Sequence, residues 1–288
     1  MTEEFIESQK LLPSIEYKDG QLSIPSKSEN ESSLQQRYKH RSEYQQARKQ
    51  LNIENVTANA VEELRSDPNV ENYTNNEPVD ADWISRFFQT VENVSDEQMQ
   101  QLWGRILAGE VKKPKSFSFR TLETLRNLSK AEAKSFSKIC EFAFSMPRIG
   151  LYIPDFSLNN AQDLEFSIPY NELLLMKELG FLQSQGSAFK MYSHSGFYRC
   201  VASMSGYVIE LNFNTDSNKK SLFVQGFTQV GKDLFPLIDT KQDGNYLKKI
   251  FAPFFENCSE VTYGKIGSYI GETPIASGDK MEILYSKE

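Results

Sequence analysis

The chain has 288 residues, of which 39% are hydrophobic and 25% are charged, and its formal net charge is −7. This composition predicts an ordinary soluble protein with a sizeable core, divided into two domains and a terminal tail. No apolar run is long enough to span a bilayer and the N-terminus has no apolar secretory segment, so we expect a cytoplasmic protein without membrane contact. The acidic balance argues against a protein that coats nucleic acid, because such binding depends on neutralising phosphates.

The first 81 residues divide into three segments. Residues 1–33 show little period and contain Pro and Gly, which favours a flexible leader; a short helix or strand docked on a partner is the alternative. Residues 34–65 contain neither Gly nor Pro and predict a long helical arm. Its apolar stripe is weak, so pairing with another copy is an attractive way to bury it. Residues 66–81, rich in Asn and Pro, predict a connector.

Residues 82–146 predict a helical bundle, because apolar side chains recur at helical spacing in four consecutive segments. Trp83 lies on the first apolar stripe and Trp103 on the second. At each helix start a polar side chain is expected to accept a hydrogen bond from a free first-turn N–H group. The expected caps are Asp80 or Asp82 for the first helix, Ser95 with Gln98 for the second, Ser118 for the third and Ser129 with Glu132 for the fourth.

Residues 147–288 predict a domain of helices and strands, which places the whole chain in the α+β class. Residues 171–182 predict a helix. Two alternating runs, at 207–213 and 221–227, flank turn-forming residues and predict an antiparallel hairpin. Thr228 is expected to cap the helix that follows. The order of these elements resembles, as a loose pattern, a small winged-helix domain.

The end of the chain predicts one more amphipathic helix at residues 244–257, followed by strands from Val261 that extend the small sheet. The cysteines are odd in number and widely separated, which indicates reduced thiols and no disulfide framework. They are Cys140, Cys200 and Cys258.

Several long segments resemble domain-of-unknown-function family 2806. They are residues 82–88, 94–100, 102–110, 116–122 and 227–234. The resemblance covers roughly residues 46–240, and its central part is long and without gaps. The family is bacterial and uncharacterised, so the resemblance implies a bacterial protein and no particular reaction.

Known catalytic and metal-binding patterns are absent from the sequence. The only histidines, His40 and His194, lie in unlike segments, and neither Cys-x-x-Cys nor His-Glu-x-x-His spacing occurs. The chain also lacks a phosphate-binding glycine loop and a Gly-x-Ser-x-Gly nucleophile elbow. We therefore expect no metal, no cofactor and no catalytic residue of a known type.

Within the segments that resemble the family, Glu110 is the acid that most needs an explanation. We interpret Glu110 as the partner of Arg105 or Arg120 in a structural ion pair. An enzyme with an unrecognised carboxylate site around Glu110 is the alternative. Together with Trp83 and Trp103, these residues are interpreted as structural parts of the motif.

Basic residues gather at two places. In the arm, cations outnumber the single acid between residues 34 and 50. One interpretation is an arm that contacts phosphates or binds a partner; the simpler one is a solvated helix face. In the predicted hairpin turn, Lys219 and Lys220 are candidates for a phosphate contact, whereas the helix at 171–182 contains Glu172 and Glu178 and is poorly suited to read DNA. The candidates in the arm are Arg37, Arg41, Arg48 and Lys49.

These observations predict a non-enzymatic protein-interaction or regulatory protein, forming a homo-oligomer or binding another protein. The bacterial setting of the resembled family places a stress or antiphage module among the hypotheses. One alternative is a DNA-binding regulator that uses the winged-helix-like domain, although the charge balance does not favour nucleic acid as a partner. The other is the enzyme with a carboxylate site described above.

Overall fold

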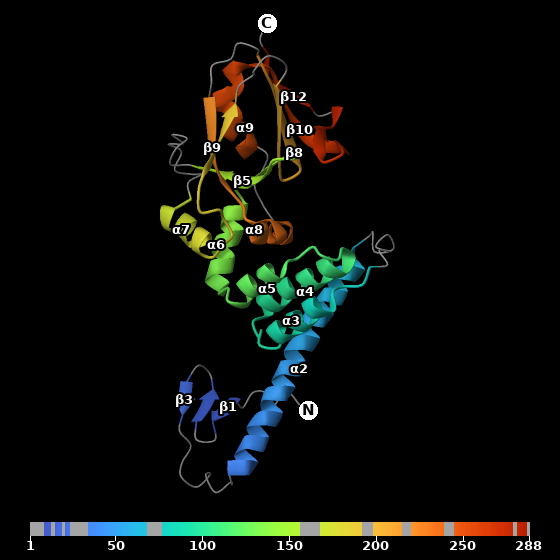
Figure 1. Cartoon of the computed structure of the whole chain (residues 1–288), viewed down its shortest axis with the longest axis vertical. Helices are drawn as coiled ribbons and strands as arrows, with labels where there is room; N and C mark the ends of the chain where they lie inside the picture. The colour runs from blue at the N-terminus through green and yellow to red at the C-terminus, as the bar shows by residue number, and fades with distance from the viewer. Residues whose placement is uncertain are drawn as a thin grey trace. The chain divides into compact units, whose positions relative to one another are not determined.

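The computed structural model in Figure 1 describes most of the chain. The described residues are 9–12, 15–18, 21–23, 34–67, 77–155, 168–191, 198–214, 220–238, 245–278 and 281–286. The chain is a mixed α+β protein with an antiparallel sheet, which confirms the predicted fold class. It forms two compact units, Met1–Phe117 and Ser118–Glu288. The boundary between them falls within the stretch of helices expected at residues 82–146.

Among its described residues, the first unit contains a small sheet and three helices. Its antiparallel sheet has the strand order β1-β2-β3 and lies in the segment that we predicted to be a flexible leader. The long helix predicted for the arm is present as α2. The bounds are β1 Gln9–Leu12, β2 Ile15–Lys18, β3 Gln21–Ser23, α2 Leu34–Ser66, α3 Ala81–Val91 and α4 Glu97–Lys112. Most of the predicted connector, residues 68–76, lies outside the described part.

The C-terminal half of α2 packs closely on α4. Val56 and Ala60 are buried on α2. Opposite them, Gly104 of α4 leaves no room for a side chain, because a Cβ atom there would lie 2.6 Å from the Cβ atom of Asn59. The N-terminal half of the same helix is more open, and Tyr38 is 65% exposed. Thus one half of the arm belongs to the core, contrary to its weak apolar stripe.

Three of the four predicted helix starts are confirmed. Asp80 accepts a hydrogen bond from the Trp83 N–H group at 2.9 Å, Ser118 caps α5, and Ser129 forms the expected capping box with Glu132. The second start was predicted wrongly. There Asp96 accepts from the Met99 N–H group at 3.1 Å, and α4 begins one residue later than a cap at Ser95 requires. A carboxylate is the better acceptor because its charge also complements the positive end of the helix.

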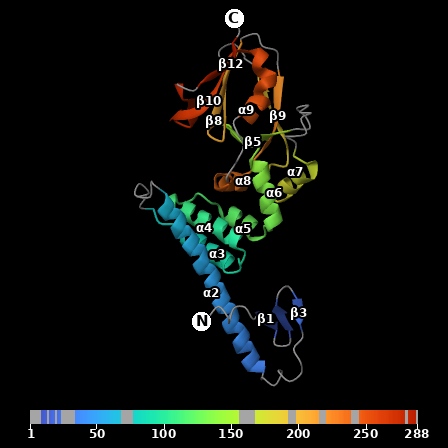
Figure 2. The ribbon, with the colours of Figure 1, turned by 180° about the vertical axis from the view of Figure 1, so that it is seen from behind.

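The second unit consists of helices and one antiparallel sheet. Among the described residues the sheet has nine strands, in the order β11-β10-β8-β7-β4-β5-β9-β6, with β12 paired to β10. The helix α9 contacts β7 and β8, and both Figure 1 and Figure 2 show it against the sheet. The helical bounds are α5 Phe119–Arg126, α6 Lys130–Cys140, α7 Tyr170–Glu178, α8 Gln229–Leu234, α9 Asn245–Phe251 and the 3₁₀ helices Phe235–Leu237 and Ala252–Asn257.

The strands of this sheet are β4 Phe144–Met146, β5 Gly150–Pro154, β6 Ser187–Met191, β7 Tyr198–Met204, β8 Tyr207–Phe213, β9 Lys220–Gly226, β10 Cys258–Ile270, β11 Thr273–Ala276 and β12 Glu282–Ser286. The last three confirm that strands follow the helix of residues 244–257. That helix changes to a 3₁₀ helix at Ala252, because Pro253 has no N–H group to continue the α-helical ladder.

The predicted hairpin between residues 207–213 and 221–227 is wrong. Both strands exist, but β8 pairs with β7 and β10, whereas β9 pairs with β5 and β6. A tighter turn competes for β8. Ser205 and Gly206 have φ angles of 49° and 78°, which suit the two-residue turn that joins β7 directly to β8. The pattern that resembled a winged helix therefore loses its hairpin, and the sheet is much larger than predicted.

Candidate functional site

The two tryptophans of the resembled motif are core residues of the first unit. Trp83 is 3% exposed and Trp103 is fully buried. Phe87 lies between them, stacked on Trp83 at 5.2 Å and edge-on to Trp103 at 5.6 Å between ring centroids. The indole N–H group of Trp83 donates to the Phe117 carbonyl at 2.8 Å. Burial and packing leave neither ring in an open cavity, as the structural interpretation of this motif expects.

The carboxylate of Glu110 holds the loop that follows α4. Glu110 is 1% exposed, and its two oxygens accept hydrogen bonds from the N–H groups of Lys115, at 2.6 Å, and Phe117, at 2.9 Å. The predicted ion pair with Arg105 or Arg120 is therefore wrong. Its partners are backbone groups of a loop in which Lys115 adopts a positive φ of 72°, a conformation uncommon for residues other than glycine.

The two arginines proposed for that ion pair lie elsewhere. Arg105 faces Glu63 of α2, with a nitrogen–oxygen distance of 3.9 Å, and Arg120 is exposed on α5. An ion pair as long and as exposed as the first contributes little to stability. The role of Glu110 is thus that of a buried acceptor for backbone donors, which is a structural role.

A second buried carboxylate, which the sequence did not single out, joins two of the motif segments in the second unit. Asp233 of α8 accepts hydrogen bonds from the Thr121 hydroxyl at 2.6 Å and from the Ser118 N–H group at 3.2 Å. The Gln229 side chain donates to its other oxygen at 2.6 Å. Residues 116–122 and 227–234 both belong to the segments that resemble the family. This common feature was the sequence signal that could have suggested a contact between them.

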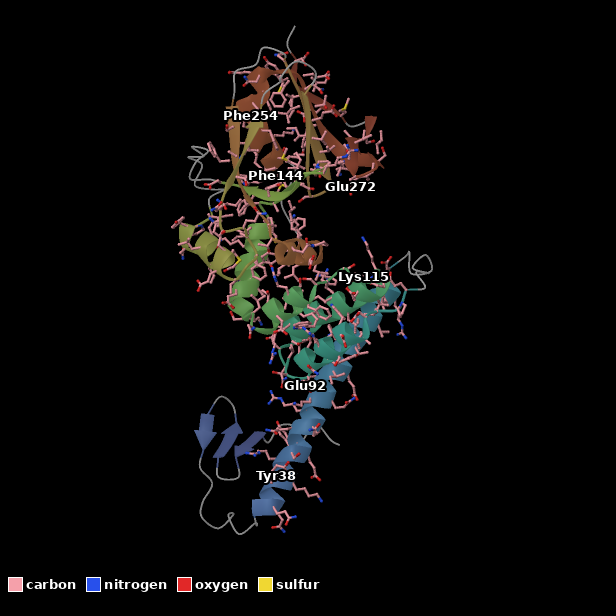
Figure 3. The ribbon with its side chains drawn as sticks, in the orientation of Figure 1. Tyr38, Glu92, Lys115, Phe144, Phe254 and Glu272 are labelled. Carbon is pink, nitrogen blue, oxygen red and sulfur yellow. The ribbon has the colours of Figure 1, made fainter. Side chains whose placement is uncertain are left out.

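A polar groove beside α2 is the strongest candidate for a binding site. Its volume is about 530 Å³, and we call it the arm groove. Figure 3 shows Glu92 beside α2, with Tyr38 nearer the N-terminal end of that helix. The groove is lined by Arg41, Tyr44, Gln45, Arg48, Lys49 and Asn52 of α2 and by Glu92 and Asn93, which follow α3.

The arm groove carries an excess of positive charge. Its acid, Glu92, forms an ion pair with Lys49, with 2.6 Å between Nζ and Oε1. The side chains of Arg41 and Arg48 form no ion pair or hydrogen bond in the part of the chain that the structure describes. The lining thus has three cations and one anion in a protein of net charge −7. Two guanidinium groups remain available to an anionic ligand.

Hydrogen bonds fix the wall of the groove. The Asn52 amide donates to the Glu92 carbonyl at 2.9 Å, which ties the end of α3 to α2. The Gln100 amide of α4 donates to the Asn52 oxygen at 3.3 Å and to the Val94 carbonyl at 2.9 Å. Because Asn52 and Gln100 are both 5% exposed, this network is protected from water. The turn that presents Glu92 is therefore held in place before any ligand arrives.

Comparison with known families adds one result. Residues 36–251 match the family described as protein of unknown function (DUF2806). The chain belongs to the DUF2806 family. No curated protein and no solved structure matches it. The matched range includes the arm groove as well as the loop held by Glu110, so both are parts of the DUF2806 region of the chain.

The remaining basic candidates of this DUF2806 chain cannot be placed beside the groove. The side chain of Arg37 and the whole of Lys219 lie outside the described residues. Lys220 begins β9, and its side chain is likewise not described. The structure therefore brings together Arg41, Arg48 and Lys49 of the predicted set. Their partners in the lining were missed because Glu92 and Asn93 lie in the turn after a different helix, α3.

The described residues of this DUF2806 chain include the buried free thiols of Cys140 and Cys258. The same described residues contain no cluster of three or more His, Cys, Asp or Glu residues able to hold a metal. Burial raises the pKa of the Cys258 thiol to about 12, and it raises the pKa of Cys140 further, so neither is a thiolate near neutral pH. None of the described helices combines the length and the apolar character needed to cross a bilayer.

Proposed function

We propose that this DUF2806 chain is a non-enzymatic binding protein whose arm groove binds an acidic protein partner. One observation carries the proposal. The side chains of Arg41 and Arg48 both line the groove without an ion pair to a described residue, while Glu92 is already paired with Lys49. Guanidinium groups stay charged at any physiological pH and bind carboxylates through two parallel hydrogen bonds. A groove with two such groups at hand is suited to acidic side chains.

Charge disfavours self-association of this half of the arm. In a pair of arms, the cations of one copy would face those of the other. Glu43 is the single acid between residues 34 and 50, and it is already close to Lys39, at 3.9 Å. Like charges across a helical seam destabilise it. A different protein, or a more acidic surface of a second copy, is therefore the better partner, and its identity would decide any regulatory, stress or antiphage role.

The DNA-binding alternative has less support. It relied on a hairpin that would present Lys219 and Lys220, and β8 and β9 are not neighbours in the sheet. On helix α7, Glu172 forms an ion pair with Lys138 at 3.3 Å, so the charge of this lysine is already neutralised.

The proposal is tested by fluorescence anisotropy of the full chain with a labelled poly-glutamate peptide at low salt. We expect binding that weakens as salt is added, because screening removes attraction between exposed charges. The double variant R41E/R48E should bind at least about tenfold more weakly, since each reversed charge turns attraction into repulsion.

The matched control is R120E/K134E, which reverses two exposed cations on α5 and α6 and has the same net charge. It should retain binding within a factor of about two, because neither side chain lines the arm groove. Absence of binding at low salt, or equal losses in the two double variants, would overturn the proposed function.

A further inference from the structure

The arm groove continues the seam between α2 and α4. Along α2, the buried residues Asn52, Val56 and Ala60 recur every four positions on the face that α4 and the preceding turn cover. Toward the N-terminus the same face continues through Arg48 and Arg41, which line the groove. Residues three or four apart on a helix lie on one face, so groove and seam form a single stripe. The stripe is covered by α4 at one end and lines the arm groove at the other.

We infer that the arm groove binds an acidic α-helix of a protein partner, laid on α2 as an extension of the seam that α4 fills. This inference rests on the proposed function and names the form of the ligand. Two observations select a helix. The groove continues a helix–helix interface, and its lining is cationic where the seam is mostly apolar. The occupant that extends the seam is therefore helical and acidic.

The spacing of the arginines sets the pattern of the partner. Arg41 and Arg48 are seven residues apart, which corresponds to about 10.5 Å along the helix axis at 1.5 Å per residue. Carboxylates seven residues apart on a second helix have the same separation, and seven is the repeat of paired helices. Between the arginines, Tyr44 is 7% exposed and contributes a ring to the groove. A small or apolar residue between the two carboxylates of the partner would face that ring.

A nucleic acid fits the groove less well than an acidic helix. Its affinity grows with the number of phosphates that the protein neutralises. The groove offers only two guanidinium groups that form no ion pair with a described residue, and the carboxylate of Glu92 lies in its wall. A short acidic helix needs only those two contacts and gains the remaining contact area from α2.

The experiment compares two helical peptides with the full chain. Both are alanine-rich and about 21 residues long, because shorter helices are only marginally formed in water. In the first, three glutamates follow the seven-residue spacing and share one face. In the second, the same glutamates point in different directions. We expect the wild-type chain to bind the first peptide at least about fivefold more tightly than the second.

Reversing the charges on both the peptide and the chain distinguishes binding at the arm groove from non-specific electrostatic attraction. A peptide with lysines at the three spaced positions should bind R41E/R48E and not the wild-type chain. Circular dichroism and tryptophan fluorescence should show R41E/R48E folded, since neither arginine forms an ion pair in the described residues. Should the variant unfold, R41Q/R48Q replaces it, and loss of preference for the spaced peptide is then the expected result.

The outcomes distinguish this inference from the proposed function. Equal binding of the two glutamate peptides, with loss in R41E/R48E, would overturn the helical pattern and leave an acid-binding groove. Tighter binding of a short single-stranded oligonucleotide than of either peptide would overturn both in favour of a nucleic-acid partner. No binding of any anion would remove the proposed function together with the inference.

Discussion

The buried carboxylate of Glu110 offers the most direct test of the structural interpretation of the family motif. We consider its replacement by alanine. In the structure, both oxygens accept backbone N–H groups, and the Phe117 N–H group is buried. The variant E110A leaves these donors without an acceptor, in a loop where Lys115 already adopts a positive φ. The loop then has to unfold locally, admit water or tolerate unpaired donors.

The cost can be worked from the two hydrogen bonds. A hydrogen bond to a charged group contributes about 1.5–3 kcal/mol, so loss of both predicts that E110A is destabilised by about 3–6 kcal/mol. The variant E110Q keeps one carbonyl acceptor and turns an NH₂ group toward the other N–H donor. It should therefore lose about 1.5–3 kcal/mol. For a protein of ordinary stability, about 5–15 kcal/mol, the first loss is a large fraction of the total.

The assay is urea unfolding followed by tryptophan fluorescence. Both tryptophans of the chain, Trp83 and Trp103, lie in the first unit, and the Trp83 indole donates to the carbonyl of Phe117, in the same loop. The signal therefore reports on the part of the protein that Glu110 stabilises. The exposed Glu62 of α2 supplies the control E62A, expected within about 0.5 kcal/mol of wild type. An E110A protein as stable as wild type would refute the reasoning and revive the carboxylate-site enzyme.

Three further predictions concern other buried contacts. The variant G104A should destabilise the first unit, because overpacking costs about 1–3 kcal/mol and exceeds the gain of about 1 kcal/mol in helix propensity; tryptophan-monitored urea unfolding measures it. The variant T121V removes the 2.6 Å hydrogen bond to Asp233 and should destabilise the second unit by about 1–3 kcal/mol, measured by far-ultraviolet circular dichroism. Finally, the free energy of unfolding should fall as pH rises above 9. Burial raises the pKa of Cys258 from 9.0 to about 12, and it raises the pKa of Cys140 further. These thiols therefore ionise first in the unfolded chain, which stabilises that state relative to the folded one. Urea unfolding on either side of pH 9 tests this.

Each of these predictions has a matched control. G109A makes the same substitution in the same helix but meets only the ring of Phe117, and it should cost less than G104A; the reverse order would contradict the close approach of α2 and α4. T124V changes a threonine of α5 for which no contact with Asp233 exists and should be near neutral. Replacing both buried cysteines by alanine should flatten the dependence of stability on pH above 9, and an unchanged slope would assign that dependence to other groups.

The sequence by itself determined the local structure. Ser118 and Ser129 could be identified as caps because each side-chain oxygen accepts a hydrogen bond from the N–H group of a residue only three positions away. The long helix α2 followed equally from a segment without Gly or Pro. The error at Ser95 was also local, since two adjacent residues could serve as the cap and the charged one did so. In such cases both partners of the decisive hydrogen bond lie within one turn of helix.

Only the tertiary structure decided the contacts between distant segments. Glu92 lies 43 residues from Lys49, and Asp233 lies 112 residues from Thr121, so no local period relates either pair. The same holds for β8 and β9, whose alternation predicted strands but not their neighbours in the sheet. Alternation determines which face of a strand is apolar, whereas pairing depends on the other strands that compete for each edge. The arm groove exists for this reason, since α2 supplied its cations and the fold placed the turn after α3 beside them.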